Sequence, residues 1–481
     1  MLGFGYGAIP ALGPALDPGR GAWTSAAGGE PVRAQTLSLP GLRHAVTVSF
    51  TSQGFASVRA ASDHDMFLAL GYVHAQFRLS EMDEERRLGE GRLAQLGGPP
   101  DLASDEFELR LGLLRTANTE WAQMPKNGLA AQALTAYAQG VNDDIAQVRA
   151  SGQWPAAFSL AGVYPGPWTP VDSLVIQGEL TQELDFTSTP LDYALLERSL
   201  GAARTMDWFG VFAKNAQIPY DPGPYAKLPL APLIPGLTPG PASTGTTASN
   251  PARSGPTAAE ATAAGALLAQ LSQLPDQGSG QLHEYPDSNA WAANGPAVAG
   301  GGALLAGDPH LPQTIPSVWY EAALSAPGFD AAGVGVPGLP GILIGHNARI
   351  AWSLTDTQNQ ATLFYAEKTR PGQYYWHGAW RPMQVVHYTI GVRGAATRPL
   401  TVDITVHGPI MTQAGQTTSV DWMGNVPSPD LAAILAVDQA ASFSQFKAAL
   451  AGWYAPTQNF VYADRAGNIG CLLYTSPSPR D

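Results

Sequence analysis

Two kinds of hydrophobic patterning divide the chain. Residues 46–61 alternate between apolar and polar positions and contain β-branched side chains, which predicts two strands joined by a turn at Gln53-Gly54. Ser62 then offers N-cap chemistry for a long helix. Apolar residues recur at helical spacing over residues 66–96, 105–150 and 171–200, with a break expected at Pro190. The first part of the chain is therefore predicted to be rich in helices.

The pattern changes twice further along the chain. Residues 221–287 are dense in Pro, Gly, Ser, Thr and Ala, which is typical of a linker, with only a weak helix indicated over residues 258–274. From Ser288 onward, short alternating segments separated by Gly and Pro predict strands, beginning with a hairpin. A helical pattern over residues 431–453 and a last hairpin from residue 459 follow. This order predicts an α+β fold with packed sheets.

Composition and charge exclude several classes of protein. The 481 residues carry a net charge of −13, with a pI near 5.1, so the chain lacks the basic surface that nucleic-acid binding requires. The longest run with basic residues, 84–87 (EERR), is interpreted as a solvated helix face. No window is long and apolar enough to predict a membrane span. Cys471 is the only cysteine, which excludes an intramolecular disulfide and a cysteine-based zinc site.

The two ends of the chain differ from the rest. Residues 1–29 are apolar but lack the basic start and cleavage site of a signal peptide, so they are interpreted either as an N-terminal arm or as the remnant of an export signal. A periplasmic or extracellular location is favoured. Residues 470–481 do not continue the preceding pattern, and a reverse translation of CLLYTSPSPRD resembles a sequencing-library adapter. We therefore expect this tail to be foreign, the alternative being a natural tail.

The chain contains no HExxH, P-loop or GxSxG motif. The glycine-rich stretch 333–338 (GVGVPG) is followed by prolines and opens no helix, so it is interpreted as a turn between strands. One remaining possibility is an N-terminal nucleophile. If cleavage of the linker freed Ser288, that residue would carry both a hydroxyl and an α-amine, and an amine with a pKa near 8 can serve as the general base.

Several blocks in the sequence resemble the penicillin acylase family of N-terminal nucleophile hydrolases, in the order and spacing of that family. The resemblance covers about residues 30–220 and 288–469, and it implies an αββα sandwich that is incomplete in this chain. The blocks are 69–79 (ALGYVHAQFRL), 288–291 (SNAW), 307–311 (GDPHL), 316–321 (PSVWYE), 337–341 (PGLPG), 345–352 (GHNARIAW) and 458–464 (QNFVYAD).

The resemblance also implies how the chain is divided. Residues 30–223 match the helical α chain of the family, residues 224–287 match the spacer that is removed, and residues 288–469 match the first part of the β chain. Self-cleavage between Asp287 and Ser288 would leave α and β chains associated as a heterodimer. The family often has Gly before the nucleophile, so Asp287 is expected to slow or alter the cut.

The family's catalytic residues carry over to four positions. The resemblance makes Ser288 the acylated nucleophile, with the side-chain amide of Asn459 and the backbone N–H of Asp356 as oxyanion donors. It also implies that the ring of His310 accepts from the Ser288 hydroxyl or orients it. The structural alternatives are a turn or sheet-end asparagine at 459 and an ordinary loop histidine between prolines at 310.

The resemblance also bears on ligands. Leu311, Ile344 and Leu354 are the predicted substrate-binding residues, and an aliphatic lining suits an alkyl acyl chain on a small N-acyl amide. No cofactor is expected. Gln360 and Leu363 stand where the family's calcium loop has aspartates, so this loop does not predict a calcium site.

Three functional hypotheses follow. The first is an amide hydrolase precursor that cuts itself before Ser288 and works through an acyl-serine intermediate. The second is a secreted or surface β-rich binding protein, which would remain one uncut chain. The third is an acylase fragment that is inactive because the resemblance places further β-chain strands beyond the end of this sequence.

Overall fold

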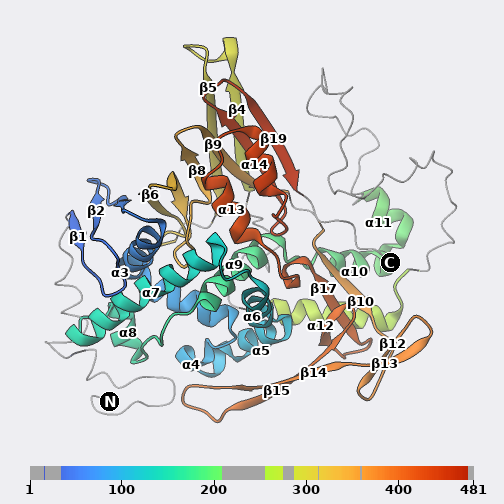
Figure 1. The fold of residues 1–481 in the computed structure, drawn as a ribbon. Coiled ribbons are helices and arrows are strands. Elements are labelled where there is room, and N and C mark those ends of the chain that lie inside the picture. Colours follow the sequence, from blue (N-terminus) through green and yellow to red (C-terminus); the bar gives the residue numbers. More distant parts are fainter. Residues whose placement is uncertain are drawn as a thin grey trace.

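A computed structural model describes residue 16 and residues 34–208, 255–274, 287–311, 314–357 and 360–474 (Figure 1). Helices dominate the first half of this part of the chain and strands the second, which confirms the predicted α+β class. Most of the predicted N-terminal arm and much of the predicted spacer lie outside the described residues.

The largest sheet joins strands from both halves of the chain. Its order is β1-β2-β3-β6-β7-β8-β9-β18-β19, and β3 pairs with β6 in parallel while the other pairs are antiparallel. The hairpin predicted over residues 46–61 is therefore part of this sheet. The strands are β1 (Gln35–Leu37), β2 (Val46–Phe50), β3 (Ala56–Arg59), β6 (Tyr320–Ala326), β7 (Phe329–Gly335), β8 (Ile344–Asn347), β9 (Ile350–Asp356), β18 (Gln458–Asp464) and β19 (Ile469–Tyr474).

Two of these strands bear on earlier predictions. The stretch 333–338 forms the end of β7 and the turn that follows it, as expected. Cys471, in the tail that was expected to be foreign, lies in β19 and pairs with Val461 of β18.

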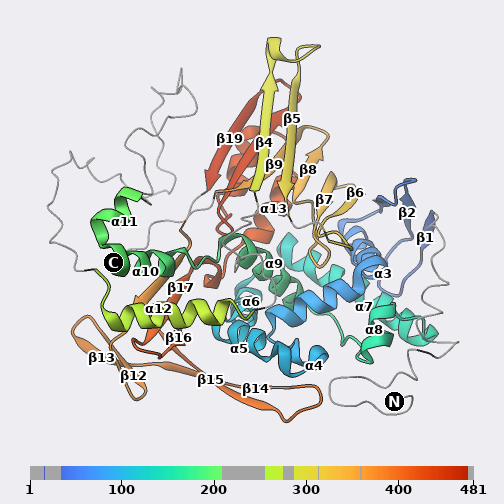
Figure 2. The ribbon, with the colours of Figure 1, turned by 180° about the vertical axis from the view of Figure 1, so that it is seen from behind.

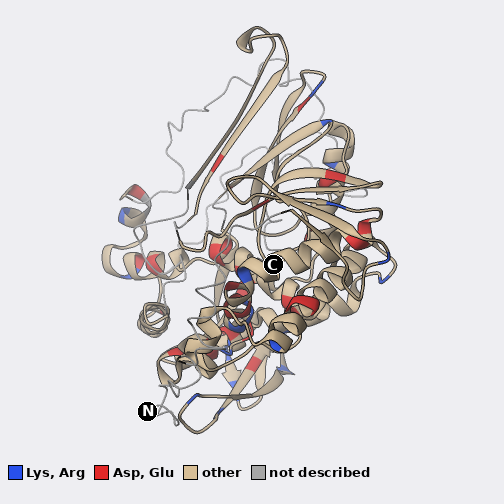
Figure 3. Ribbon diagram, turned by 90° about the vertical axis from the view of Figure 1, so that its left-hand side faces the viewer, with Lys and Arg blue, Asp and Glu red and all other residues tan. Residues whose placement is uncertain are grey.

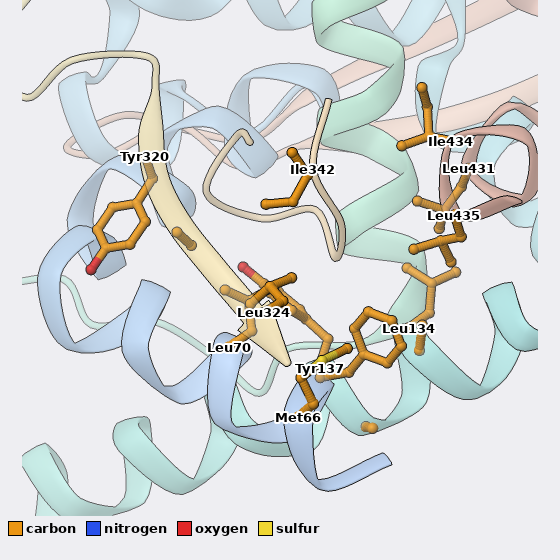
Figure 4. Packing of buried hydrophobic residues seen from close by; sticks show 14 of the residues in the cluster. Met66, Leu70, Leu134, Tyr137, Tyr320, Leu324, Ile342, Leu431, Ile434 and Leu435 are labelled. Carbon is orange, nitrogen blue, oxygen red and sulfur yellow. The ribbon is translucent and has the colours of Figure 1, made fainter. Parts of the chain in front are cut away.

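Helices cover one face of the large sheet. Figure 4 shows Met66 and Leu70 of α3 packed near Leu324 of β6 and Tyr137 of α7. Helices α3 (Asp63–Gly89), α13 (Asp430–Asp438) and α14 (Phe443–Leu450) pack on the strands of this face, and α7 (Leu129–Ser151) and α9 (Pro170–Asp185) pack on α3.

Two glycines allow α3 and α7 to approach closely. A Cβ on Gly140 would lie 1.8 Å from the carbonyl oxygen of Leu68, and a Cβ on Gly71 would lie 2.1 Å from that of Tyr137. The predicted cap is also present, because the Ser62 hydroxyl accepts a hydrogen bond from the Asp65 amide at 3.2 Å.

The interpretation of residues 84–87 as a solvated face is wrong for both arginines. Arg86 and Arg87 are each only 3% exposed. Both donate to the buried Asp83, at 2.7 and 2.8 Å, and Arg86 also reaches Asp172 of α9 at 3.2 Å. Burial is tolerated because each charge has an opposite partner. One partner lies more than eighty residues away, so a local charge pattern could not reveal it.

The break expected at Pro190 lies slightly earlier. Helix α9 ends at Asp185, and Pro190 sits in the first turn of the next helix, where its missing N–H is not needed. The remaining helices are α4 (Ala94–Gly97), α5 (Leu102–Leu111), α6 (Leu113–Gln123), α8 (Ala156–Ala161), α10 (Thr189–Leu200), α11 (Ala202–Trp208) and α12 (Ala258–Leu271). Among the described residues, we find no helix with the length and apolar character needed to cross a membrane.

Three smaller sheets complete the structure, as Figure 2 shows from behind. A hairpin of β4 (Asp287–Asn294) and β5 (Ala303–His310) lies over the face of β9 and β18 that the helices leave free. A five-stranded sheet has the order β10-β17-β16-β15-β14, and a three-stranded ribbon has the order β11-β12-β13. These strands are β10 (Thr362–Ala366), β11 (Thr369–Arg370), β12 (Gln373–Trp376), β13 (Ala379–Pro382), β14 (Gln384–Ile390), β15 (Arg398–Thr405), β16 (Gly408–Thr412) and β17 (Thr418–Trp422).

Candidate active site

Ser288 is the second residue of strand β4. It lies opposite Pro309 of β5, and Asp287 lies opposite His310. The peptide bond between Asp287 and Ser288 is thus held at the start of a paired strand. Figure 3 shows the hairpin mostly in tan, and its two strands contain two acidic residues, Asp287 and Asp308, and no Lys or Arg.

The side chain of Ser288 is on the inner face of the hairpin. Gly307 marks this face, because a Cβ there would lie 1.9 Å from the hydroxyl of Ser353 in β9. Gly307 pairs with Ala290, and directly paired residues share a face. Since side chains alternate along a strand, Ser288 shares that face two residues before Ala290. It therefore points toward β9 and β18.

Asn459 also faces the space between the two sheets. Its neighbours in β18, Phe460 and Tyr462, point the other way and pack on Phe446 of α14, with ring centroids 6.4 and 5.0 Å apart. Alternation then directs Asn459 toward the hairpin. Asn459 lies opposite Thr355 of β9, and its Nδ2 donates to the Thr355 hydroxyl at 3.1 Å.

Ser288 and Asn459 lie at the same end of their strands. The Nδ2 of Asn294, at the far end of β4, donates to the carbonyl of Gly467 at 2.9 Å. Gly467 belongs to the turn that follows β18. Both β4 and β18 therefore run toward this turn, and Ser288 and Asn459 each occupy the second position of their strand. Figure 2 shows the open end of the β4–β5 hairpin on the side of α9.

Asp356 is the last residue of β9 and lies opposite Gln458. Its backbone N–H is the second predicted oxyanion donor. It follows Thr355 directly along β9, so it lies beside the Thr355–Asn459 pair. The structure brings Ser288, Asn459 and Asp356 to one end of the space between the sheets.

Asp185 is a residue of this region that sequence reasoning missed. It ends α9, and its carboxylate accepts hydrogen bonds from the amide and hydroxyl of Thr457, at 2.8 and 2.9 Å. Burial raises the pKa of Asp185 to about 7, and the nearby charge of Asp356 adds to this. The helical region thereby holds the chain two residues before Asn459. A helix-terminal Asp carries no sequence signal for such a distant partner.

His310 does not contact Ser288 in the structure, contrary to the expected hydrogen bond. It pairs with Asp287, so alternation places its side chain on the outer face of the hairpin. Its Nε2 lies 3.0 Å from the carboxylate of Asp308 and 3.5 Å from the Nδ2 of Asn289. Ser288 pairs with Pro309, and His310 is the next residue along β5, so its side chain lies on the opposite face of the hairpin from the Ser288 side chain.

The predicted substrate-binding residues fall in different places. Leu354 is 6% exposed and belongs to the main core, because it lies opposite Phe460 on the helix-covered face of β9. Its predicted place in an acyl pocket is therefore corrected. Ile344 is partly buried against the same core, and Leu311 follows directly after β5.

The described residues contain no group of three or more His, Cys, Asp or Glu arranged to hold a metal ion. Two residues after Gln360, Thr362 begins β10 and uses its hydroxyl to donate to the carbonyl of Asp185 at 3.1 Å and to accept from the amide of Thr187. These neutral hydrogen bonds tie the start of β10 to the end of α9 and the residues after it.

A serine at the head of one sheet, facing an asparagine amide on another, is the arrangement expected of an N-terminal nucleophile hydrolase. The chain belongs to the penicillin amidase family, whose model matches residues 45–476. This confirms the family that the sequence blocks suggested. Together with the helices and sheets above, it also confirms the fold class.

Curated relatives carry acylase names. The acyl-homoserine lactone acylase QuiP of Pseudomonas fluorescens (strain Pf0-1) is 30% identical over 449 residues, which cover 90% of this chain and 50% of the relative. Penicillin acylase 2 proenzyme of Pseudomonas sp. (strain SE83) is 28% identical, covering 92% of this chain and 54% of the relative. The chain spans about half the length of these relatives.

Solved structures of thermostable penicillin G acylase from Alcaligenes faecalis also match. The orthorhombic form is 32% identical and covers 34% of this chain and 32% of that chain, with a TM-score of 0.31.

Proposed function

We propose that this chain is part of the precursor of an amide-hydrolysing acylase in which Ser288 becomes the N-terminal nucleophile. One observation carries the proposal: Ser288 and Asn459 lie at the same end of two packed strands and point into the same space. The acylase names of the relatives support it.

The first step is the cut. The Ser288 hydroxyl attacks the carbonyl carbon of Asp287, and the bond between that carbon and the Ser288 nitrogen breaks as the nitrogen takes up the hydroxyl proton. The product is an ester between Asp287 and the Ser288 oxygen. Water then hydrolyses this ester, leaving a new carboxylate at Asp287 and a free α-amine on Ser288.

Turnover uses the groups that the cut creates. The α-amine removes the proton of the Ser288 hydroxyl, through a water, and the oxygen attacks the carbonyl carbon of a substrate amide. The Asn459 Nδ2 and the Asp356 N–H stabilise the resulting oxyanion. The amine product leaves with the proton, and water hydrolyses the acyl ester to regenerate Ser288. One hydrogen of the Asn459 amide is held by Thr355, which leaves the second for the oxyanion.

His310 stays outside these steps, because its hydrogen bonds lie on the outer face of the hairpin. For the substrate, we propose a small N-acylated amide with an alkyl acyl chain. The aliphatic Leu311 and Ile344 support this choice, as do relatives named for acyl-homoserine lactones.

The intact mass of the purified chain tests the cut. We expect a second chain that begins at Ser288, and we expect a single uncut chain from Ser288→Ala. Ser52→Ala, which changes an exposed loop serine, should still be cut and serves as the control. Cleavage before residue 288 in Ser288→Ala would show that Ser288 does not perform it.

A second test concerns turnover. Phenylmethylsulfonyl fluoride should label the cut protein on Ser288 and leave the uncut variant unlabelled. A series of N-acyl amides with different acyl chains should then be hydrolysed, with alkyl chains preferred over phenylacetyl. An uncut, unlabelled wild-type chain would favour the binding-protein hypothesis instead.

A further inference from the structure

Helix α12 (Ala258–Leu271) lies within residues 224–287, the segment matched to the removable spacer. It begins with a capping box, in which the Thr257 hydroxyl accepts from the Glu260 amide and the Glu260 carboxylate accepts from the Thr257 amide. Figure 2 shows this helix lying along α10, and it also contacts β16. This part of the predicted spacer is thus a folded helix in contact with the rest of the protein.

One side of α12 is buried. Ala263, Ala264 and Leu267 are each only 2–3% exposed, and Leu268 and Leu271 pack partly buried on the same cluster. These positions recur at helical spacing and form an apolar stripe. The other side, which includes Thr262, Ala269 and Gln270, is exposed. The helix is therefore amphipathic in the way expected of a docked element.

The surface beneath α12 is built from both halves of the chain. Its aromatic residues pack edge to face: the ring centroid of Phe186 lies 5.5 Å from that of Phe107 and 6.0 Å from that of Trp422. Trp422 is 1% exposed with α12 in place. The apolar cluster that includes Ala264 and Leu267 of α12 also contains Phe107, Leu111, Leu113, Phe186, Leu191, Met411, Val420 and Trp422.

The turn after β16 also fits the helix closely. A Cβ on Gly415 would lie 2.7 Å from the carbonyl oxygen of Ala259 and 2.9 Å from the Cβ of Thr262. Gly415 has a φ of 74°, which a residue with a side chain rarely adopts. The approach of this turn to α12 thus depends on a glycine.

We propose that α12 remains docked as a folded part of the processed enzyme after the cut before Ser288. This rests on the proposed function for the cut itself. Removing α12 would expose a contiguous apolar surface of aromatic and aliphatic side chains, which folded proteins rarely leave uncovered. The segment that leaves the enzyme therefore excludes residues 258–271.

The first experiment isolates the self-processed protein by size exclusion and determines the mass of every chain under denaturing conditions. We expect residues 258–271 to be present, either attached to the upstream chain or as a separate peptide. A folded, processed protein from which these residues are missing would overturn the proposal. If the wild-type chain is uncut, the proposed function fails, and the second experiment still tests the docking.

The second experiment does not depend on self-cleavage. A Ser288→Ala variant is made with two inserted recognition sites for a specific protease. One site lies between residues 209 and 254, and the other lies between residues 275 and 286. After both cuts, the α12 peptide should co-elute with the remaining protein. Loss of the peptide from a protein that stays folded by circular dichroism would overturn the proposal.

Two variants of α12 make this test specific. Leu267→Asp places a charge on the buried side and should release the peptide after both cuts. Gln270→Asp adds the same charge to the exposed side and should leave it bound. Equal retention in the two variants would show that the buried stripe does not hold the helix, and would count against the docking.

Discussion

The Nδ2 of Asn459 donates to the hydroxyl of Thr355 at 3.1 Å, across the β18–β9 pair and beneath the hairpin that carries Ser288. A hydrogen bond between two neighbouring strands of one sheet thus fixes the orientation of the Asn459 amide, the proposed oxyanion donor. The Thr355 hydroxyl is a positioning group in this arrangement, because its contact is with the amide.

Asn459→Ala should lower kcat by about 10²–10³, or about 2.7–4 kcal/mol, because it removes the proposed oxyanion donor, which would act mainly in the transition state. KM should change little. Thr355→Val should have a smaller effect on kcat, roughly tenfold, because the amide remains but is less well oriented. Steady-state kinetics on an N-acyl amide measures both. Asn468→Ala, in the turn at the far end of β18, is the control, and an equal loss there would argue for a general structural effect.

The close approach of Gly307 to Ser353 predicts that a substitution at Ser353 can compensate for one at Gly307. Gly307→Ala would place its Cβ 1.9 Å from the Ser353 hydroxyl and 2.7 Å from its Cβ, so the hairpin must shift. We expect a loss of roughly 1–3 kcal/mol in the free energy of unfolding and slower self-cleavage. Adding Ser353→Gly removes both obstructing atoms and should restore most of the cleavage rate.

Ser353→Gly alone serves as the control for this pair. The Ser353 hydroxyl is buried and has no hydrogen-bond partner among the described residues, so its removal costs little beyond the greater flexibility of glycine. Urea unfolding and the rate of chain cleavage measure the effects. A double variant no better than Gly307→Ala would contradict this view of the packing.

Asp185 gives a prediction for pH. Its pKa in the folded protein is raised from 3.8 to about 7, so the folded state holds a proton that the unfolded state releases. The stability from this group is therefore fully present below about pH 4 and is lost as the pH rises through about 7. Asp185→Asn cannot ionise and can still accept from the Thr457 amide. It should match the wild type near pH 4 and exceed it by roughly 3–5 kcal/mol at pH 8, because a difference of one pKa unit corresponds to about 1.4 kcal/mol.

Asp185→Ala separates this electrostatic effect from the hydrogen bonds. It leaves the buried amide and hydroxyl of Thr457 without their partner and should destabilise the protein at every pH, by roughly 1–3 kcal/mol. Denaturant unfolding between pH 4 and 8 measures all three proteins. Parallel pH profiles for the wild type and Asp185→Asn would show that Asp185 does not titrate in this range.

Removing the hydroxyl of Tyr137 should lower the stability of the fold, although this residue is not part of the candidate active site. Its hydroxyl lies 2.7 Å from Nδ1 of His74 and accepts from the Gly338 amide at 2.8 Å. Burial lowers the pKa of His74 to about 3, so that ring is neutral and can accept the tyrosine proton. Tyr137→Phe should cost roughly 1–3 kcal/mol, because two buried polar groups lose their partner. Tyr375→Phe, at an exposed tyrosine, should be close to neutral when thermal unfolding is compared.

Local patterns predicted most of the elements. The strands within residues 46–61, the cap at Ser62, the helix within residues 258–274 and the last hairpin were all predicted, because alternation, helical spacing and capping are properties of neighbouring residues. Resemblance to a family indicated Ser288, Asn459 and Asp356 as candidate catalytic residues, and their roles stay predictions.

The remaining features depend on contacts between distant segments. Arg86 is buried because Asp172 of another helix meets it, and Asp185 acts on Thr457 from more than two hundred residues away. Leu354 and His310 were misplaced for a simpler reason. A shift of one position along a strand moves a side chain to the opposite face, and sequence similarity alone does not reveal which face is covered.

The pairing of β3 with β6 has a consequence for the order of events. These strands lie on opposite sides of the proposed cut, and their parallel register runs from Ala56 opposite Ala322 to Arg59 opposite Ser325. The two products of cleavage would thus share one continuous sheet, held together by main-chain hydrogen bonds between β3 and β6. We therefore expect folding to come before cutting, because the β3–β6 ladder, which joins strands from the two sides of the cut, forms only when both segments are present.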